Sequence, residues 1–131
     1  MKKNQGFTIL ELLITVAIIS VLVMMAYPSY TNSLVKGNRG AAKAYLLEVA
    51  QKQQQFLFDN RAYGTQAEIV ALSPTPPEVS NFYTVTITAP AGTPPTFTAR
   101  ATPRAGTRQK DDGWLEINQA GAKTSQIANK W

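Results

Sequence analysis

The sequence predicts an α+β protein in which one long N-terminal helix packs against an antiparallel β-sheet. Three features of the 131 residues predict this class. The chain opens with a long apolar run, continues with apolar residues at a period of 3.6, and ends with short segments rich in β-branched and aromatic residues. This length suffices for one modest hydrophobic core rather than two.

The apolar run extends from Phe7 to Tyr27, and Glu11 is its only charged side chain. As a helix it would be about 30 Å long, which matches the hydrocarbon core of a bilayer. We therefore expect residues 7–28 to span a membrane and a polar head to follow them. The lysines that precede this span should hold the N-terminus in the cytoplasm. A carboxylate inside such a span is costly without a partner, so Glu11 is expected to face a cation in the membrane or in an assembly of such helices.

The second half of the long helix is expected to be amphipathic. Pro28 lacks an amide hydrogen and should kink or locally open the helix, but the helical pattern resumes at once. Apolar residues then recur at spacings of three, four and seven: Leu34, Ala41, Ala42, Tyr45, Leu46, Val49, Phe56 and Leu57. The pattern predicts one helix over roughly residues 7–58, of which residues 29–58 cover the apolar face of the sheet.

A connecting loop is predicted for residues 59–80, because the prolines there oppose regular strand pairing, although a short helix around Gln66–Leu72 also fits the pattern. The sheet follows within residues 81–131. Its strands are predicted at residues 82–88, 96–101 and 114–118, and a turn then leads into a further segment at 122–124. Short connections between strands indicate an antiparallel meander, which needs the amphipathic helix as cover.

The string from Gly6 to Glu11, Gly-Phe-Thr-Ile-Leu-Glu, resembles the processing motif of type IV pilins. A short basic segment precedes it and an apolar helix follows it, as in that family. The resemblance implies that residues 1–6 are a leader peptide, which prepilin peptidase removes between Gly6 and Phe7, and that the new N-terminus of Phe7 is methylated. It also implies that Glu11 neutralises the N-terminal ammonium of a neighbouring subunit, since pairing offsets much of the cost of burying both charges.

The order of helix, loop and antiparallel sheet also resembles the type IV pilin fold. Residues 58–63, residues 112–115 and the final Trp131 resemble a subgroup that includes minor pilins. Two departures from the family stand out. Many relatives close the C-terminal region with a disulfide, and the matching positions here are Asp112 and Lys130, where an exposed ion pair would supply only about 0–1 kcal/mol. Ser20 stands where relatives often have glycine, and serine makes unwinding of the helix harder than glycine would.

The composition argues against an enzyme. The chain has no His and no Cys, which excludes nucleophile pairs, zinc sites and disulfides built on them, and its carboxylates form no recognisable acid–base pair. No cofactor and no metal are therefore expected. The string Asp111-Asp112-Gly113 could suggest calcium, but calcium takes about six to eight oxygens, and turn formation explains these residues better.

Four basic residues lie within eleven positions without an acidic residue between them: Arg100, Arg104, Arg108 and Lys110. A basic exposed loop can contact phosphate backbones, so these side chains are candidate DNA contacts. The alternative is that they only keep an exposed loop soluble.

We therefore expect a structural subunit, a minor type IV pilin. It would start as an inner-membrane precursor and be built with other pilin subunits, by the pilus assembly machinery, into an extracellular pilus for adhesion, twitching motility or DNA uptake. Two alternatives stay open: a pseudopilin of a type II secretion system, and a single-span protein whose head binds DNA or another ligand without polymerising. Sequencing of the mature N-terminus discriminates, since methylated Phe7 supports the pilin class and an intact Met1 opposes it.

Overall fold

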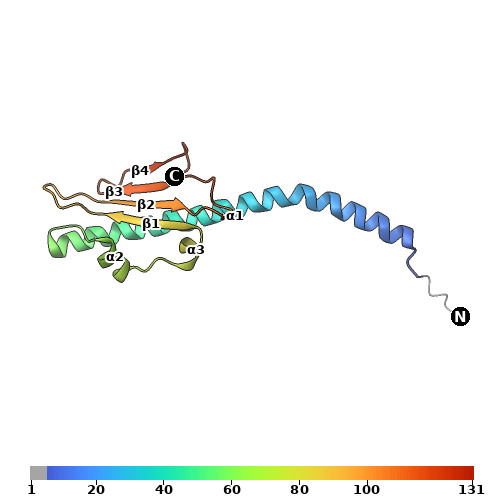
Figure 1. Cartoon of the computed structure of the whole chain (residues 1–131), viewed down its shortest axis with the longest axis horizontal. Helices are drawn as coiled ribbons and strands as arrows, with labels where there is room; N and C mark the ends of the chain where they lie inside the picture. The colour runs from blue at the N-terminus through green and yellow to red at the C-terminus, as the bar shows by residue number, and fades with distance from the viewer. Residues whose placement is uncertain (1–5) are drawn as a thin grey trace. The chain divides into compact units, whose positions relative to one another are not determined.

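The computed structural model describes residues 6–131. Its longest element is the helix α1 (Ile9–Asn60), which Figure 1 shows beside a small sheet and two short helices. The chain forms two compact units, one ending at Leu34 and the other running from Val35 to Trp131. Part of α1 belongs to each unit, so the two are described separately.

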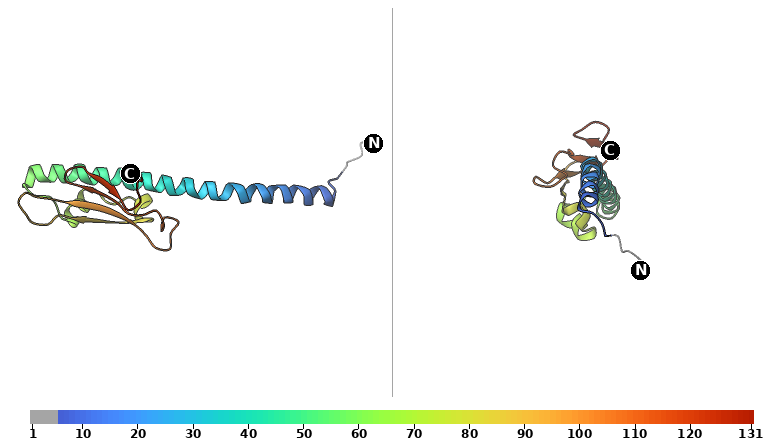
Figure 2. Two further views of the ribbon diagram at one scale, coloured as in Figure 1. Left: turned by 90° about the horizontal axis from the view of Figure 1, so that it is seen from above. Right: turned by 90° about the vertical axis from the view of Figure 1, so that its right-hand side faces the viewer.

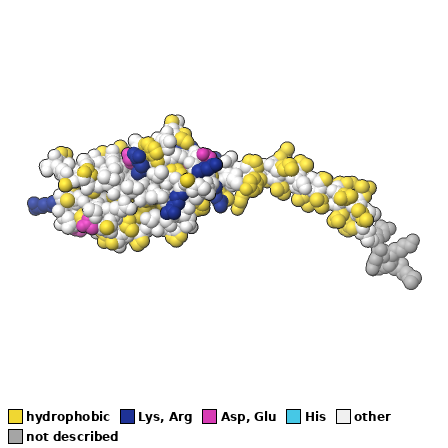
Figure 3. Space-filling view, viewed as in Figure 1, with side chains coloured by type: hydrophobic (Ala, Val, Ile, Leu, Met, Phe, Trp, Pro, Cys, Tyr) yellow, Lys and Arg dark blue, Asp and Glu magenta, His cyan; other side chains and the backbone are white. Residues whose placement is uncertain are grey.

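The first unit is an apolar helix with exposed side chains. All residues from Gly6 to Tyr30 are exposed, and apolar side chains cover much of the face seen in Figure 3. Within the described part of the chain, α1 is the one helix long and apolar enough to cross a membrane. The local opening expected at Pro28 is not seen, since α1 continues through it. Just after the proline, the Thr31 hydroxyl donates to the carbonyl of Pro28 (2.9 Å), a bond that threonine commonly makes to the preceding turn of a helix.

The second unit contains the rest of α1, two short helices and a four-stranded sheet. The short helices are α2 (Gln66–Leu72) and α3 (Pro77–Ser80). The strands are β1 (Tyr83–Thr88), β2 (Thr98–Pro103), β3 (Leu115–Asn118) and β4 (Lys123–Ser125). Each strand pairs antiparallel with the next, in the order β1-β2-β3-β4, and α1 lies along one face of the sheet (Figure 2). The predicted α+β fold, with its meander covered by the long helix, is confirmed.

Alternation along the strands gives the sheet one buried and one exposed face. On β2, for example, Ala99 and Ala101 are buried whereas Arg100 and Thr102 are exposed. The buried face meets α1 residues spaced three or four apart, as expected for one stripe of a helix. The resulting core consists of Ala42, Tyr45, Leu46, Val49, Ile69, Val79, Tyr83, Ile87, Phe97, Ala99, Ala101, Leu115 and Ile117.

The elements differ from the predicted ones in detail. The prolines at 74–77 predict a loop, yet Pro77 occupies the first turn of α3, where its missing amide hydrogen would have had no helical partner. Strand β2 begins two residues later than expected and ends at Pro103, at the end of its pairing with β1, where proline is tolerated. The short helix predicted at Gln66–Leu72 is confirmed as α2.

A side chain caps the outer edge of β1. The Gln66 amide lies 3.3 Å from both the carbonyl oxygen of Val85 and the amide nitrogen of Ile87, so it takes the place of a neighbouring strand along β1. Two backbone groups of β1 that would otherwise be open to pairing are therefore satisfied within the chain. On β4, the indole of Trp131 donates to the carbonyl of Thr124, a residue paired with Glu116 of β3, and so ties the C-terminal residue to the sheet.

The chain reversal after α1 is anchored by Gln53, which is fully buried. Its side-chain nitrogen donates to the carbonyl of Gly64, and its oxygen accepts from the Gly64 amide, both at 2.8 Å. A Cβ at position 64 would lie 2.9 Å from the Cδ1 of Ile69, so a larger residue there would force the Ile69 side chain to move. One side chain therefore satisfies both backbone groups of a buried residue.

Replacing Gln53 by leucine should lower the free energy of unfolding by about 2–4 kcal/mol, because both buried backbone groups of Gly64 lose their partner. Urea unfolding of the full chain in detergent micelles, followed by tryptophan fluorescence, measures this. Gln55→Leu is the matched control, since Gln55 is exposed on the same helix and its replacement should stay within about 0.5 kcal/mol. Equal stabilities of the two variants would contradict the anchoring role of Gln53.

Candidate functional site

The segment between β2 and β3, residues 104–114, carries three of the predicted DNA contacts and is called the basic loop below. Arg104, Arg108 and Lys110 are exposed in it. Arg108 lies over the ring of Phe82, with its guanidinium carbon 5.4 Å from the ring centroid, which restrains its stem. In Figure 3, basic side chains gather near the end of the sheet where β2 finishes. The loop thus presents positive charge to solvent.

Gln109 anchors the centre of the basic loop. It is fully buried, whereas its neighbours Arg108 and Lys110 are exposed. Its side-chain nitrogen lies within hydrogen-bonding distance of the Val35 carbonyl (3.0 Å) and the Tyr83 hydroxyl (2.7 Å). With Gln109 held inward, the side chains on either side of it are directed toward solvent.

Asp112 is the second anchor, and its side chain is completely buried. It forms an ion pair with Arg39 of α1 and a second with Lys130 near the C-terminus, at 3.0 Å. The Tyr83 hydroxyl donates to it at 2.6 Å, and the Gln109 amide lies 2.8 Å away. The buried carboxylate therefore joins α1, β1, the basic loop and the C-terminal segment.

The surroundings of Asp112 keep it charged. Burial raises the pKa of its carboxyl, but hydrogen bonds from Arg39, Tyr83, Gln109 and Lys130 outweigh burial and hold this pKa well below its ordinary value. Burial, followed by the hydrogen bond and charge of Asp112, raises the pKa of the Tyr83 hydroxyl. Two cations surround one carboxylate, so the cluster keeps a net positive charge.

This cluster corrects the expectation for Asp112 and Lys130. Their ion pair is present, but it is not the exposed pair that was expected, because the Asp112 side chain is buried and also bonds to Arg39. The partners Arg39, Tyr83 and Gln109 were not predicted from the sequence. The turn interpretation of residues 111–113 fits the positive φ of 80° at Gly113, and the carboxylate of Asp112 points inward to Arg39 and Lys130.

Arg100, the fourth predicted DNA contact, lies elsewhere. It is on the exposed face of β2, where its guanidinium pairs with Glu116 at 2.8 Å and covers the ring of Trp114 at 4.4 Å. Its charge is thus largely compensated by a cross-strand neighbour. The structure brings Arg104, Arg108 and Lys110 together on one loop and separates Arg100 from them.

The predicted processing and assembly residues lie at the start of α1. Gly6 and Phe7 are exposed and precede the helix, so the bond between them is not part of a helical turn. The amide and hydroxyl of Thr8 both donate to Glu11, at 2.9 and 2.8 Å, and the Glu11 amide lies 3.2 Å from the Thr8 hydroxyl. Glu11 therefore closes a capping box at this helix end. Residues 1–5 of the predicted leader lie outside the described residues.

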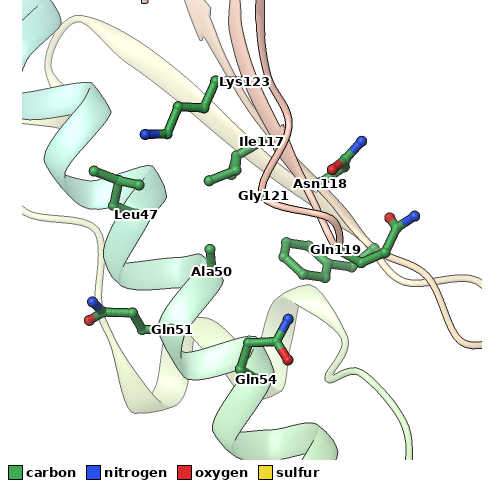
Figure 4. A pocket seen from close by; sticks show the side chains of 10 residues that line it. Leu47, Ala50, Gln51, Gln54, Ile117, Asn118, Gln119, Gly121 and Lys123 are labelled. Atoms are coloured by element: carbon green, nitrogen blue, oxygen red, sulfur yellow. The ribbon is translucent and has the colours of Figure 1, made fainter.

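A groove of about 340 Å³ lies between α1 and the turn that joins β3 to β4 (Figure 4). Amide side chains surround an apolar floor in it, and Lys123 is the titratable residue of its lining. The lining comprises Leu47, Ala50, Gln51, Gln54, Phe97, Ile117, Asn118, Gln119, Gly121 and Lys123. These lining residues include no acid–base pair, and none of them belongs to the basic loop.

Two family models match the chain. Residues 28–113 match the model described as type IV minor pilin ComP, DNA uptake sequence receptor. Residues 1–27 match the prokaryotic N-terminal methylation motif. The first match covers the head as far as Gly113 of the basic loop and does not include β3 and β4, and the second covers the predicted leader and nearly all of the apolar helix.

Curated relatives of the chain include pilins and secretion proteins. It is 33% identical over 73 residues to the type IV wide pilus major component PilA4 of Thermus thermophilus, covering 55% of this chain and 56% of PilA4. It is 31% identical over 90 residues to the type IV major pilin protein PilA of Myxococcus xanthus, covering 69% of this chain and 40% of PilA. Type II secretion system core protein G of Dickeya chrysanthemi is 25% identical over 85 residues, 62% of this chain and 56% of that protein. The chain thus spans about half the length of the curated relatives it matches.

Proposed function

Because the chain belongs to the type IV minor pilin family described as ComP, DNA uptake sequence receptor, we propose that it is a pilus subunit whose head binds DNA through the basic loop. The observation that carries this proposal is the exposure of Arg104, Arg108 and Lys110 on one anchored loop. Such cations bind the phosphates of DNA, and each phosphate that a cation neutralises releases counterions. DNA uptake is therefore the pilus function that this head supports best, ahead of adhesion or twitching motility.

Charge compensation in and around the loop supports the same proposal. Asp112 is the loop's buried carboxylate, and Arg39 and Lys130 already neutralise it. Asp111 is exposed and offsets part of the positive charge. The three positive charges of the loop still outnumber the one negative charge of Asp111, so a phosphate backbone would meet a positive surface.

For assembly, we propose that prepilin peptidase cleaves between Gly6 and Phe7 and that the new N-terminus is methylated. The match of residues 1–27 to the N-terminal methylation motif supports this. In the filament, Glu11 would then pair with the Phe7 ammonium of a neighbouring subunit. The precursor would reside in the inner membrane, and the pilus assembly machinery would add it, with other pilin subunits, to an extracellular pilus. A role in a type II secretion pseudopilus has weaker support, because core protein G is 25% identical whereas PilA4 is 33% identical.

The DNA-binding proposal predicts a salt-dependent affinity that depends on the loop. For the full mature chain in detergent micelles, Arg104→Ala/Arg108→Ala should weaken binding to duplex DNA. It should also reduce the slope of log K against log salt by about 0.9 for each phosphate that the protein no longer neutralises. Fluorescence anisotropy over a salt series measures both quantities.

The control for this experiment is Lys43→Ala/Lys52→Ala, which removes the same charge from α1. If charge alone mattered, both double variants would bind DNA more weakly by the same factor. Equal reductions in affinity, or no reduction in either variant, would refute binding through the basic loop.

A further inference from the structure

Asp112 is a buried acidic side chain in the loop proposed to bind DNA. Its carboxylate reaches Arg39 of α1, Tyr83 of β1 and Lys130 near the C-terminus. By charge alone, a carboxylate at this place should repel a phosphate backbone. Its contacts suggest the opposite contribution, because they tie the basic loop to three other segments.

The backbone of the basic loop has few ties of its own to the sheet. The Arg104 amide donates to the Phe82 carbonyl at 2.8 Å where the loop begins. Further along, the amides of Thr107 and Lys110 donate to carbonyls within the loop, at 3.4 and 3.2 Å. Attachment of the loop's centre to α1 and β1 therefore comes from the buried side chains of Gln109 and Asp112.

We infer that Asp112, although negatively charged, positions the cations of the basic loop for binding to DNA, together with Gln109. This inference rests on the proposed function of the loop. A loop that is already ordered loses less conformational entropy on binding, and its cations meet the phosphates without rearrangement. Repulsion by Asp112 is small because Arg39 and Lys130 compensate its charge within 3.0 Å.

The first test compares Asp112→Asn with Asp111→Asn in the full mature chain in micelles. Both variants remove one negative charge at adjacent positions, but Asp112 is buried and bonded whereas Asp111 is exposed. Coulomb attraction alone predicts tighter DNA binding in both. Positioning predicts that Asp111→Asn binds slightly tighter, whereas Asp112→Asn binds roughly tenfold weaker because several long side chains lose their fixed arrangement.

Gln109→Met keeps the test decisive if Asp112→Asn folds poorly. Methionine has a similar length, the net charge is unchanged, and the ion pairs of Asp112 with Arg39 and Lys130 stay in place. We expect weaker binding with an unchanged salt slope, since every loop cation is still present. Arg108→Ala, in contrast, should reduce the slope by about 0.9. Near-UV circular dichroism at the binding temperature verifies that each variant is folded.

Two outcomes separate the inference from the function on which it rests. If Arg104→Ala/Arg108→Ala weakens binding but Asp112→Asn and Gln109→Met bind as tightly as the unmodified chain, the positioning role is refuted and DNA binding stands. If the unmodified chain shows no binding that depends on salt and on the loop cations, both proposals fail. The positioning role is supported if Asp111→Asn and Asp112→Asn change the affinity for DNA in opposite directions. It is also supported if Gln109→Met binds DNA more weakly with an unchanged salt slope.

Discussion

Replacing Asp112 by alanine is expected to lower the free energy of unfolding of the head by about 3–5 kcal/mol. The substitution removes the buried carboxylate that the partly buried cations of Arg39 and Lys130 share, and removing one partner of a buried ion pair has this cost. The Tyr83 hydroxyl and the Gln109 amide lose an acceptor at the same time. Urea unfolding of the full chain in micelles at pH 7 gives the value.

Two neighbouring substitutions serve as controls for Asp112→Ala. Asp111→Ala removes an exposed carboxylate and should change the free energy of unfolding by less than about 0.5 kcal/mol. Lys130→Ala should cost only about 1 kcal/mol, because its side chain is 26% exposed and Arg39 still compensates Asp112. A loss of stability for Asp112→Ala no larger than that for Asp111→Ala would show that the cluster does not stabilise the head.

The same cluster sets the pH range over which its contribution persists. The folded pKa of Asp112 is depressed, so its contribution is complete above the ordinary value of 3.8 and is lost as the pH falls through the lower folded value. The folded pKa of Tyr83 is raised, so its contribution is complete below 10.0 and is lost as the pH rises through the higher folded value. The difference in stability between the unmodified chain and Asp112→Ala should therefore be flat from about pH 4 to pH 10.

Replacing Glu11 by alanine should nearly abolish incorporation into pili while leaving an inserted and cleaved precursor. If Glu11 pairs with the N-terminal ammonium of a neighbouring subunit, its loss leaves that charge buried and unpaired. The cost of about 3–5 kcal/mol corresponds to roughly two to four orders of magnitude in an association constant. Glu11→Gln should give an intermediate level, since it keeps an acceptor but loses the charge. Pilus incorporation at matched membrane levels is the measurement.

The capping box at the start of α1 calls for a further control. Glu11→Ala also removes the acceptor of the Thr8 amide and hydroxyl, so poor assembly could result from a frayed helix end. Thr8→Ala disrupts this cap at a cost of about 1 kcal/mol but keeps the carboxylate. Near-normal incorporation of Thr8→Ala alongside failure of Glu11→Ala would assign the defect to the missing charge. Normal incorporation of Glu11→Ala would remove the assembly role and leave a membrane anchor.

The fold was predictable where local patterns and global packing agree. The 3.6-residue period that ends near Leu57 follows the face of α1 that meets the sheet, and alternation in residues 83–88 follows the two faces of β1. The short helix α3 was missed because prolines weaken both strands and helix interiors, so a run of them predicts a loop. Proline does fit the first turn of a helix, but the sequence does not show that Pro77 begins one.

The site was less predictable, because its contacts join distant parts of the chain. The basic residues of the loop are visible as a local run, and their exposure followed from it. The ion-paired residues Arg39 and Asp112, however, are 73 positions apart. Asn38, whose side-chain amide donates to the Gln109 side-chain oxygen at 3.2 Å, lies 71 positions from it. A buried ion pair leaves no periodic signal, and Gln109 resembles any polar loop residue until its burial is known.

The capped edge of β1 bears on how copies of this pilin can join. An open edge strand would let two heads pair by strand addition in any register. The Gln66 amide occupies the Val85 carbonyl and the Ile87 amide, two outward-facing groups of β1 that such pairing would use. If the chain assembles as proposed, contacts between its copies would then fall to the apolar half of α1, and the first strand of the head would be protected from amyloid-like association before it reaches the filament.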